Sequence, residues 1–318
     1  MMKILLIGAK GQLGSQIMHI IKNGKSELGS VPAEVLNAEI IETDVDTLDI
    51  TNLQMVKESV KTNMPDVVIN CAAFTNVDGC ESSKDLAFKV NALGARNVAI
   101  ACEEIGAKLI HVSTDYVFSG VGSTPLSEDA ITAPVSAYGT TKLLGEEYVR
   151  EFCSKYFIVR TAWLYGYFGK NFVYTIMRAG KERGKLTVVN DQKGNPTNAE
   201  DLAYHLLKLA LTEEYGVYHC TGEGECTWYD FACKIIEYAG IECEVLPVTS
   251  EEYKTPAKRP EYSSLDNMML RCTIGNDMRE WKDALKVFIG NYKNHIKEYL
   301  LRRSFIYEGN YFSWRIRN

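Results

Sequence analysis

The sequence predicts an α/β fold, a doubly wound parallel sheet of Rossmann type with a smaller, mainly C-terminal substrate-binding lobe. The chain opens with a short unbroken apolar run, residues 3–7, that leads into a glycine-rich turn. Short apolar runs then alternate with longer amphipathic segments as far as residue 219. Apolar runs without polar alternation are typical of strands buried on both faces, and parallel strands need helical crossovers.

The composition indicates a globular protein that handles small molecules. The 318 residues are 46% hydrophobic, enough to fill the core of one large domain or two closely joined ones. A net charge of −6 argues against a nucleic-acid surface. The N-terminal apolar run, residues 4–7, is too short for a signal peptide or a membrane span. We therefore expect small-molecule partners, no nucleic acid, no membrane and a cytoplasmic location.

The cysteines and histidines predict neither disulfides nor a metal site. The nine cysteines are odd in number and include no Cys-x-x-Cys pair, so we interpret them as reduced thiols. The five histidines lack the spacing of metal ligands, and no acidic loop of the calcium-binding type is present. We expect no metal.

The first turn predicts a dinucleotide site. Gly8, Gly11 and Gly14 recur at intervals of three, directly after the first predicted strand and before a predicted helix at 15–21. Glycines allow close backbone approach, and the helix N-terminus faces the pyrophosphate of the cofactor. A tight turn without a ligand is the alternative, but the position after the first buried strand favours the cofactor. Gln12 and Leu13, inside this turn, are assigned to the same site.

Two further places extend this site. After an expected loop at 24–37, a second strand at 39–43 ends in Asp44, where a carboxylate would meet the adenosine ribose. An ordinary surface acid is the alternative. Small residues after the next strand, at 67–70, would let the cofactor lie against the backbone, although tight core packing would also explain them. These residues are Ala72, Ala73 and Thr75.

The apolar periodicity predicts the remaining elements. Strands are expected at 108–112, 156–160, 186–190 and 216–219, and helices at 53–62, 82–104, from Tyr138 onward, at 171–183, at 200–211 and up to residue 239 from a cap at Thr227. We expect residues 1–164, completed by 186–219, to form the dinucleotide-binding domain. Residues 165–185 and 220–285 would form the substrate-binding lobe.

The C-terminal residues 286–318 predict an amphipathic helix at 287–301 and an aromatic tail. Exposed aromatic residues on an acidic protein suggest a docking or oligomer surface, and a homodimer is possible on this ground. A disordered tail, or one that packs back on the protein, is the alternative.

Tyr138 and Lys142 are the candidate catalytic pair. They are four residues apart, so both side chains project from one face of a helix. A nearby ammonium stabilises a phenolate and brings its pKa down from about 10, which suits a proton donor to a carbonyl oxygen. Thr114, just after the strand at 108–112, would add a hydroxyl to that oxygen. Such a pair occurs by chance in many surface helices, but the order of glycine turn, Ser-Thr step and Tyr-Lys pair favours catalysis.

The ordered motifs resemble those of the extended short-chain dehydrogenase/reductases and, within them, the dTDP-4-dehydrorhamnose reductases, over approximately residues 2–285. The glycine triplet and Tyr138-x-x-x-Lys142 are the motifs of the larger superfamily. The narrower family is indicated by Gly11-Gln12-Leu13-Gly14, Ser113-Thr114-Asp115-Tyr116-Val117-Phe118, Arg160-Thr161-Ala162-Trp163-Leu164-Tyr165-Gly166, Asn171-Phe172, Gly194-Asn195-Pro196-Thr197, Trp228-Tyr229-Asp230-Phe231-Ala232 and Pro256-Ala257-Lys258-Arg259-Pro260.

This resemblance implies NAD(P)H-dependent reduction of the 4-keto group of dTDP-6-deoxy-L-lyxo-4-hexulose to dTDP-L-rhamnose. Carried over by position, the catalytic residues are Thr114, Tyr138 and Lys142. Tyr138, Lys142 and Asn91, which supports Lys142, also belong to the cofactor site. The residues that meet the sugar nucleotide are Thr114, Asp115, Trp163, Asn171 and Arg259. A guanidinium suits a diphosphate. A structural role is the alternative for each residue, above all for Trp163. The magnesium reported at a dimer interface in one lineage is not carried over, because its acids are not clearly matched.

For the cofactor we expect NADH in preference to NADPH. The Asp44 carboxylate would repel a 2'-phosphate, and residues 45–50 offer no arginine or lysine to hold one. Lys10 in the glycine turn is the counterargument, because its side chain would reach toward the 2'-position.

Two other functions fit the same motifs. A sugar-nucleotide epimerase or dehydratase would keep NAD bound and recycle it, but dehydratases of this scaffold place a glutamate after the aspartate, and here Tyr116 follows Asp115. A non-catalytic subunit resembling the regulatory subunit of methionine adenosyltransferase is the second. Intact Thr114, Tyr138 and Lys142 favour an enzyme over that subunit.

Overall fold

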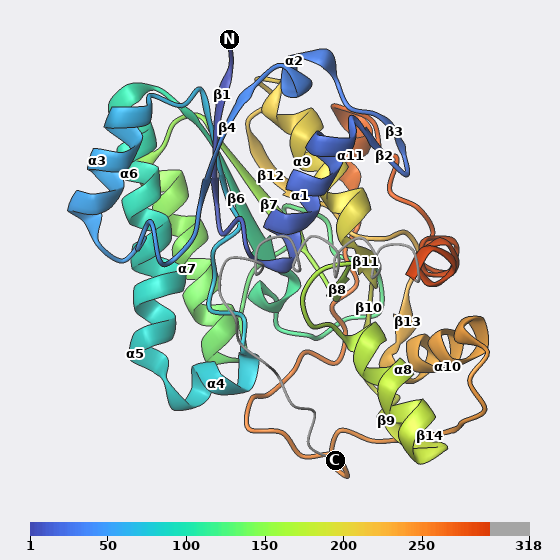
Figure 1. Cartoon of the computed structure of the whole chain (residues 1–318). Helices are drawn as coiled ribbons and strands as arrows, with labels where there is room; N and C mark the ends of the chain where they lie inside the picture. Colours follow the sequence, from blue (N-terminus) through green and yellow to red (C-terminus); the bar gives the residue numbers. More distant parts are fainter. Residues whose placement is uncertain (293–318) are drawn as a thin grey trace, which may run out of the picture.

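A computed structural model describes residues 1–292, and its centre is a six-stranded sheet in the order β12-β7-β6-β5-β1-β4 (Figure 1). All neighbouring strands are parallel. The strands are β1 (Lys3–Ile7), β4 (Glu39–Thr43), β5 (Val67–Asn70), β6 (Lys108–Thr114), β7 (Tyr156–Thr161) and β12 (Gly216–His219). The chain passes from β1 to β4 on one side and then to β5 on the other, which creates a crevice at the carboxyl ends of β1 and β5. The predicted doubly wound parallel sheet is confirmed.

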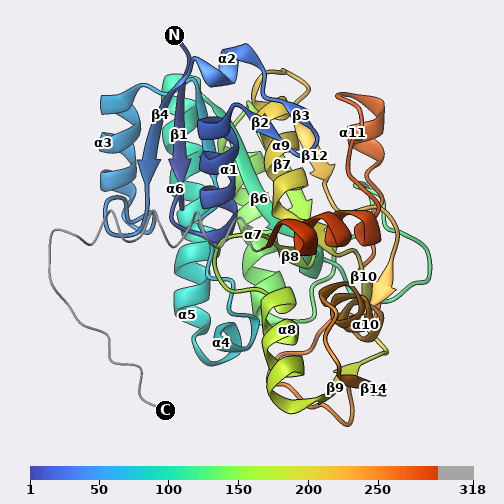
Figure 2. The same ribbon diagram turned by 45° about the vertical axis from the view of Figure 1, so that its right-hand side comes forward.

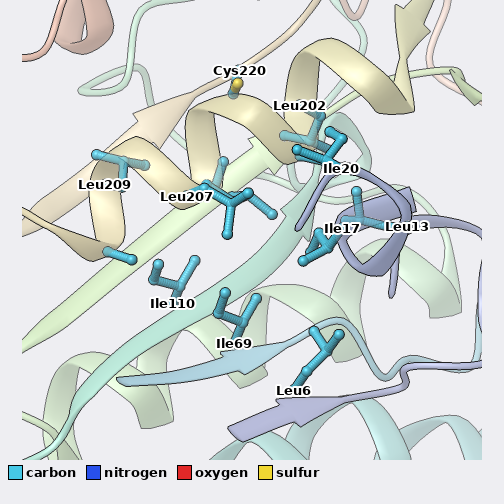
Figure 3. Packing of buried hydrophobic residues seen from close by; sticks show 14 of the residues in the cluster. Leu6, Leu13, Ile17, Ile20, Ile69, Ile110, Leu202, Leu207, Leu209 and Cys220 are labelled. Atoms are coloured by element: carbon cyan, nitrogen blue, oxygen red, sulfur yellow. The ribbon is translucent and has the colours of Figure 1, made fainter. Parts of the chain in front are cut away.

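Helices cover both faces of the sheet. One face carries α1 (Gln12–Asn23) and α9 (Ala199–Ala210), and the other carries α3 (Leu53–Asn63), α6 (Ala95–Ile105) and α7 (Ala137–Phe152) (Figure 1). In Figure 3, Leu6, Ile69 and Ile110 of the sheet lie against Leu13 and Ile17 of α1 and Leu202 and Leu207 of α9, all of them buried. Burial on both faces explains why these strands read as unbroken apolar runs.

A smaller lobe lies beyond the carboxyl ends of the strands (Figure 2). It contains α8 (Phe172–Arg183), β9 (Lys185–Val189), α10 (Trp228–Ala239) and β14 (Glu244–Val248), together with a helical segment at 281–292. Its core includes Tyr165, Phe231, Trp281 and Phe288. Thr227 and Asp230 form a capping box at the start of α10, as the predicted cap requires.

Residues 186–219 do not all complete the large sheet as expected. α9 and β12 do, but β9 pairs in parallel with β14 inside the smaller lobe. Its side chains alternate between exposed and buried. A strand with one solvated face does not fit a sheet that helices cover on both sides, so β9 lies in a two-stranded sheet with one face open.

Two predicted segments have more structure than expected. The loop at 24–37 contains β2 (Lys25–Ser26), β3 (Gly29–Ser30) and α2 (Ala33–Leu36). The single helix expected at 82–104 is instead α4 (Val77–Ser82), α5 (Lys84–Ala87), a π-helical turn η1 (Phe88–Gly94) and α6. Gly94 packs on Ile50, where an added Cβ would lie 2.6 Å from the Ile50 Cδ1. π-helical turns are rare, and the spacing of apolar residues did not indicate this one.

The remaining elements are short. They are a 3₁₀ turn η2 (Asp115–Val117), β8 (Leu164–Tyr165), β10 (Lys193–Gly194), β11 (Thr197–Asn198), β13 (Cys226–Thr227) and α11 (Met268–Cys272). No helix within residues 1–292 has the length and apolar character needed to cross a membrane. The predicted helix at 287–301 lies partly, and the aromatic tail wholly, outside the described residues.

Candidate active site

Two adjoining hollows lie along the carboxyl edge of the sheet. The first, of about 460 Å³, lies at the ends of β1, β4 and β5, and the second, of about 520 Å³, extends from β5 and β6 to the smaller lobe. Both are lined by Gly11, Cys71 and Ala73. One elongated ligand, or two ligands end to end, would therefore meet at these three residues.

The glycine turn is shaped as a cradle. Gly8 has a φ of 81°, and a Cβ on Gly14 would lie 2.2 Å from the Gly8 carbonyl oxygen, so both positions require glycine. The helix α1 begins at Gln12, three residues earlier than predicted, and no side chain caps its first turn. Its free N–H groups can receive a diphosphate, so these residues fit a dinucleotide.

The other predicted cofactor residues lie around this cradle. Asp44, Ala72 and Ala73 line the first hollow, whereas Gln12, Leu13 and Thr75 line the second. The Asp44 carboxylate accepts hydrogen bonds from the backbone N–H groups of Lys10, at 2.9 Å, and Val45, at 2.9 Å. The Lys10 ammonium pairs with Asp46 at 2.5 Å. Gln12 donates to the Leu164 carbonyl at 3.2 Å and so links the cradle to the second hollow.

The structure brings Thr114, Tyr138 and Lys142 together in the second hollow. The strand β6 runs two residues further than predicted and ends at Thr114. On α7, a Cβ on Gly139 would lie 2.1 Å from the Tyr116 carbonyl oxygen. Glycine therefore lets α7 pack against η2, which carries Tyr138 next to the Ser-Thr-Asp turn.

Burial dominates the electrostatics of this pair. Burial raises the pKa of Tyr138, while hydrogen bonding with Thr114 opposes the rise. Burial also lowers the pKa of Lys142 to about 8, and Glu146 opposes that shift. The Lys142 nitrogen donates to the Val112 carbonyl at 2.7 Å. The expected lowering of the Tyr138 pKa by Lys142 is absent from this arrangement, because desolvation outweighs the other effects.

Asn91 supports the site differently from the expectation. It lies in η1, where its side-chain oxygen accepts from the Phe74 N–H at 2.8 Å and its amide nitrogen donates to Thr141 Oγ1 at 3.2 Å. These bonds join the loop after β5 to α7. Asn91 therefore links the Phe74 backbone to the helix that carries Lys142.

Asp115 is a buried carboxyl at the second hollow. One oxygen accepts from Thr114 Oγ1 at 2.9 Å, and the other, Oδ2, has no hydrogen-bond partner. Burial raises the pKa of Asp115 to about 6. Hydrogen bonding with Ser263 and Thr114 opposes this rise, so Ser263 is a further polar group beside the carboxyl.

Trp163 forms part of the wall of the hollow. Its φ of 46° is unusual for a residue other than glycine and costs about 1–3 kcal/mol. Its indole stacks on that of Trp228, with ring centroids 3.6 Å apart, and Gly194 lies directly beneath it. Both indoles line the hollow. The surrounding contacts hold Trp163 in a strained conformation at the site, unlike an ordinary core residue.

Arg259 also lines the second hollow and is held by Asp78 at the start of α4. The guanidinium donates to Asp78 Oδ2 at 2.9 Å, and the other Asp78 oxygen accepts from the Ala257 N–H at 3.1 Å. Asp78 thus fixes both the loop and the side chain of Arg259. It tethers a segment of the smaller lobe to the large domain.

Asn171 is the predicted substrate residue that the structure does not place in the hollow. It caps α8 by accepting from the Tyr174 N–H at 3.1 Å, and it donates to the Gly166 carbonyl at 2.8 Å. An amide that caps a helix has few bonds left for a ligand. The hydrogen bonds of Asn171 are therefore structural, and its contact with the sugar nucleotide stays a prediction.

Sequence reasoning did not assign four other residues at the site, Asp78, Tyr116, Lys170 and Trp228. Trp228 and Tyr116 each lie in one of the family motifs, but the motifs gave neither residue a contact with a ligand. No local sequence pattern indicates that Asp78 belongs to the site, because its partner Arg259 is 181 residues away.

The arrangement can hold an elongated cofactor beside a second ligand and supply a proton where they meet. A phenol and a hydroxyl converge in the second hollow, while the amino group of Lys142 lies one helical turn away from the phenol. This combination suits reduction of a carbonyl by hydride transfer.

Comparisons with known proteins agree with this chemistry. The model of the RmlD substrate binding domain matches residues 2–294. A dTDP-4-dehydrorhamnose reductase of Escherichia coli K12 is 38% identical, covering 90% of this chain and 96% of that protein. A crystal structure of a dTDP-4-dehydrorhamnose reductase from Clostridium acetobutylicum superposes with a TM-score of 0.86 and 48% identity, over 92% of this chain and 100% of that one. The crystal structure of the dTDP-4-dehydrorhamnose reductase from Bacillus anthracis in complex with NADP superposes with a TM-score of 0.84 and 43% identity, over 90% of this chain and 98% of that one.

Proposed function

Because this chain belongs to the dTDP-4-dehydrorhamnose reductase family, we propose that it reduces the 4-keto group of dTDP-4-dehydrorhamnose with NADH or NADPH to give dTDP-L-rhamnose. The observation that carries the proposal is the position of Thr114, Tyr138 and Lys142 in the hollow that adjoins the dinucleotide cradle. A reductase needs its proton donor where cofactor and substrate meet.

The mechanism assigns one task to each residue. The bound cofactor supplies a hydride to the carbonyl carbon. Tyr138 donates its phenolic proton to the carbonyl oxygen, and Thr114 hydrogen bonds to the same oxygen. Lys142, as an ammonium, stabilises the phenolate that remains.

The second hollow also offers groups for the rest of a sugar nucleotide. We assign Arg259 to the diphosphate and the free oxygen of Asp115 to a sugar hydroxyl. The stacked indoles of Trp163 and Trp228 would bound the ligand on the side of the smaller lobe. On this assignment residues 165–185 and 220–285, together with β9, form the substrate-binding lobe.

For the coenzyme we propose NADH in preference to NADPH. Asp44 lines the first hollow, where its carboxylate can accept from ribose hydroxyls and would repel a 2'-phosphate. Lys10, which could hold such a phosphate, is paired with Asp46. The Bacillus anthracis relative binds NADP, so a direct comparison of the two coenzymes is the necessary test.

Two finer points complete the proposal. A cytoplasmic location agrees with the cysteines, all nine of which lie within the described residues and are free thiols. A homodimer is the assembly we propose, and sedimentation of the purified protein tests it.

Two alternatives remain distinguishable. An epimerase or dehydratase would turn over without net loss of reduced cofactor, and Asp115 followed by Tyr116 disfavours dehydration. A regulatory subunit would bind the ligands without turnover.

The test mixes purified protein with NADH or NADPH and dTDP-4-dehydrorhamnose and follows the nicotinamide absorbance. We expect the absorbance to fall in proportion to the added keto sugar. The reduced product dTDP-L-rhamnose serves as the control and should cause no loss. No loss of absorbance with the keto sugar would contradict the proposed reductase.

A further inference from the structure

A buried histidine contacts Lys142 and has no part in the mechanism above. His111 lies on β6, three residues before Thr114, and is 1% exposed. Its Nε2 lies 3.3 Å from the Lys142 nitrogen, and its Nδ1 lies 3.2 Å from the amide nitrogen of Asn70. Asn70, also buried, ends the neighbouring strand β5. The three side chains form a continuous line of polar contacts beneath the active site.

The orientation of the Asn70 amide determines which groups donate and which accept in this line. The Asn70 oxygen accepts from the Ala72 backbone N–H at 3.1 Å, so its amide nitrogen faces His111 and donates to Nδ1. A neutral imidazole that accepts at Nδ1 carries its hydrogen on Nε2. That hydrogen points at the Lys142 nitrogen.

An ammonium at Lys142 does not fit this arrangement. An ammonium has three donors and no lone pair, so it would face the Nε2–H donor of His111 without any bond between them. A neutral amine has a lone pair that accepts from Nε2–H and still donates to the Val112 carbonyl, at 2.7 Å. This direction of the hydrogen bond favours the neutral amine of Lys142 over the ammonium.

The groups around Lys142 act in both directions, because burial favours the neutral amine whereas Glu146 and Cys71 favour the ammonium. The groups that interact with it are Glu146 and Cys71, and His111 on the neighbouring strand. The Glu146 carboxylate is already paired with Arg160, at 2.8 Å, and with Arg150. Burial lowers the pKa of Lys142 to about 8, and burial together with Lys142 holds the pKa of His111 well below its usual range.

We propose that Asn70 and His111 favour the neutral amine of Lys142 in the free protein, and that Lys142 takes up a fraction of a proton from solvent when the cofactor binds. This inference rests on the proposed function, because a nicotinamide dinucleotide supplies the negative charge and the ribose oxygens that favour an ammonium. His111 is then a positioning residue that couples cofactor binding to the charge of Lys142.

The test measures proton uptake when NADH or NADPH binds. Calorimetry in two buffers of different ionisation enthalpy at pH 8 gives the protons bound per cofactor. With a Lys142 pKa of about 8, we expect roughly half a proton for the native protein. Lys142→Met removes the titrating amine, and this contribution to the uptake should disappear.

His111→Phe decides the direction of the hydrogen bond. Loss of the donor to Lys142 destabilises the neutral amine, so the pKa of Lys142 rises by about one unit and the uptake at pH 8 falls to about 0.1 proton. If Lys142 were instead an ammonium donating to His111, the same substitution would lower its pKa and increase the uptake. An increase would overturn the proposal.

Three further variants separate this effect from a loss of structure. Asn70→Asp keeps the shape but draws the imidazole hydrogen to Nδ1, so uptake should also fall. His111→Gln offers an amide donor to Lys142 and should restore uptake relative to His111→Phe. His205→Phe alters a buried histidine that bonds the Asp201 carbonyl and the Asp277 N–H, and it should leave uptake unchanged.

The outcomes separate the two proposals. Normal cofactor binding with no proton uptake at pH 8 would overturn only the proposal that His111 couples cofactor binding to the charge of Lys142. Uptake as expected without reduction of the keto sugar would overturn the proposed function alone. Failure to bind either coenzyme would overturn both.

Discussion

The two adjoining hollows form one trench, with the first hollow as its cofactor half and the second as its sugar half. These two halves are built in different ways. The cofactor half is formed mainly by backbone atoms of one short stretch. Gly8 and Gly14 lack side chains that would fill the turn, and the uncapped start of α1 supplies free backbone N–H donors. The sugar half rests on side chains from distant segments, including Thr114, Trp163 and Arg259. The first half depends on local geometry, and the second depends on how the domain and the lobe pack.

This difference predicts where substitutions act. Changes to the substrate-facing side chains of the sugar half, such as Arg259, should alter turnover or substrate binding and leave cofactor affinity intact. Changes in the cofactor half should alter coenzyme binding and choice. The following predictions test this separation.

Tyr138→Phe should give the largest effect, a loss of turnover of about 10²- to 10⁴-fold with cofactor affinity nearly unchanged, because it removes the proton donor. Steady-state kinetics and a cofactor titration measure the two effects. Tyr116→Phe is the matched control, since that ring lies edge-on to Tyr138 at 5.5 Å and lines the same hollow. We expect it to lose less than about tenfold. Equal losses of turnover in the two variants would contradict the assignment of Tyr138 as the proton donor.

Arg259→Ala should raise the KM for the nucleotide sugar roughly 10- to 100-fold, because a charged hydrogen bond to the diphosphate is lost. Asp78→Asn keeps the guanidinium but weakens its tether, so we expect a smaller rise in the same direction. Cofactor affinity should not change in either variant. A loss that falls on the cofactor would break the division between the halves.

Asp115→Asn should lower kcat/KM by about tenfold and flatten its acid limb. The pKa of Asp115 is raised to about 6 by burial, so the native carboxylate is charged above this pH and becomes neutral as the pH falls through it. Native kcat/KM should therefore decline below about pH 6. An unchanged acid limb in the variant would assign that limb to another group.

Asp44→Ala should give the smallest effect, a gain of about two- to fivefold in the use of NADPH relative to NADH, because a partly exposed carboxylate no longer repels the 2'-phosphate. The specificity constants of both coenzymes measure it. A native preference for NADPH, or no relative gain in the variant, would refute the role given to Asp44.

The same contrast explains what the sequence could predict. The glycine turn, Asp44 and the Tyr138–Lys142 pair are short-range patterns, and each lies in or beside the trench as expected. The prediction for β9 was wrong about its sheet, because the apolar pattern of a strand does not show which other strand it pairs with. Asn171 caps α8, and the sequence alone does not distinguish an amide that caps a helix from an amide that binds a sugar. The Asp78–Arg259 pair joins residues 181 positions apart, and no local pattern contains it.

The π-helical turn shows the limit of periodicity. Asn91 was identified as part of the site, but its bonds to Phe74 and Thr141 depend on the irregular backbone of η1. Neither the irregularity nor those partners follow from the spacing of apolar residues. Packing against α7, where a Cβ on Gly145 would lie 2.4 Å from the Asn91 carbonyl oxygen, defines the geometry.

The most direct test of the account is the fate of a deuterium on C4 of the reduced nicotinamide. The purified protein is given dTDP-4-dehydrorhamnose with coenzyme deuterated on either face of C4, and the product is analysed by mass spectrometry and NMR. We predict that the label from one face appears at C4 of the sugar, with one coenzyme oxidised per sugar reduced. A product that lacks the label from both faces, or turnover without net oxidation of the coenzyme, would contradict the account.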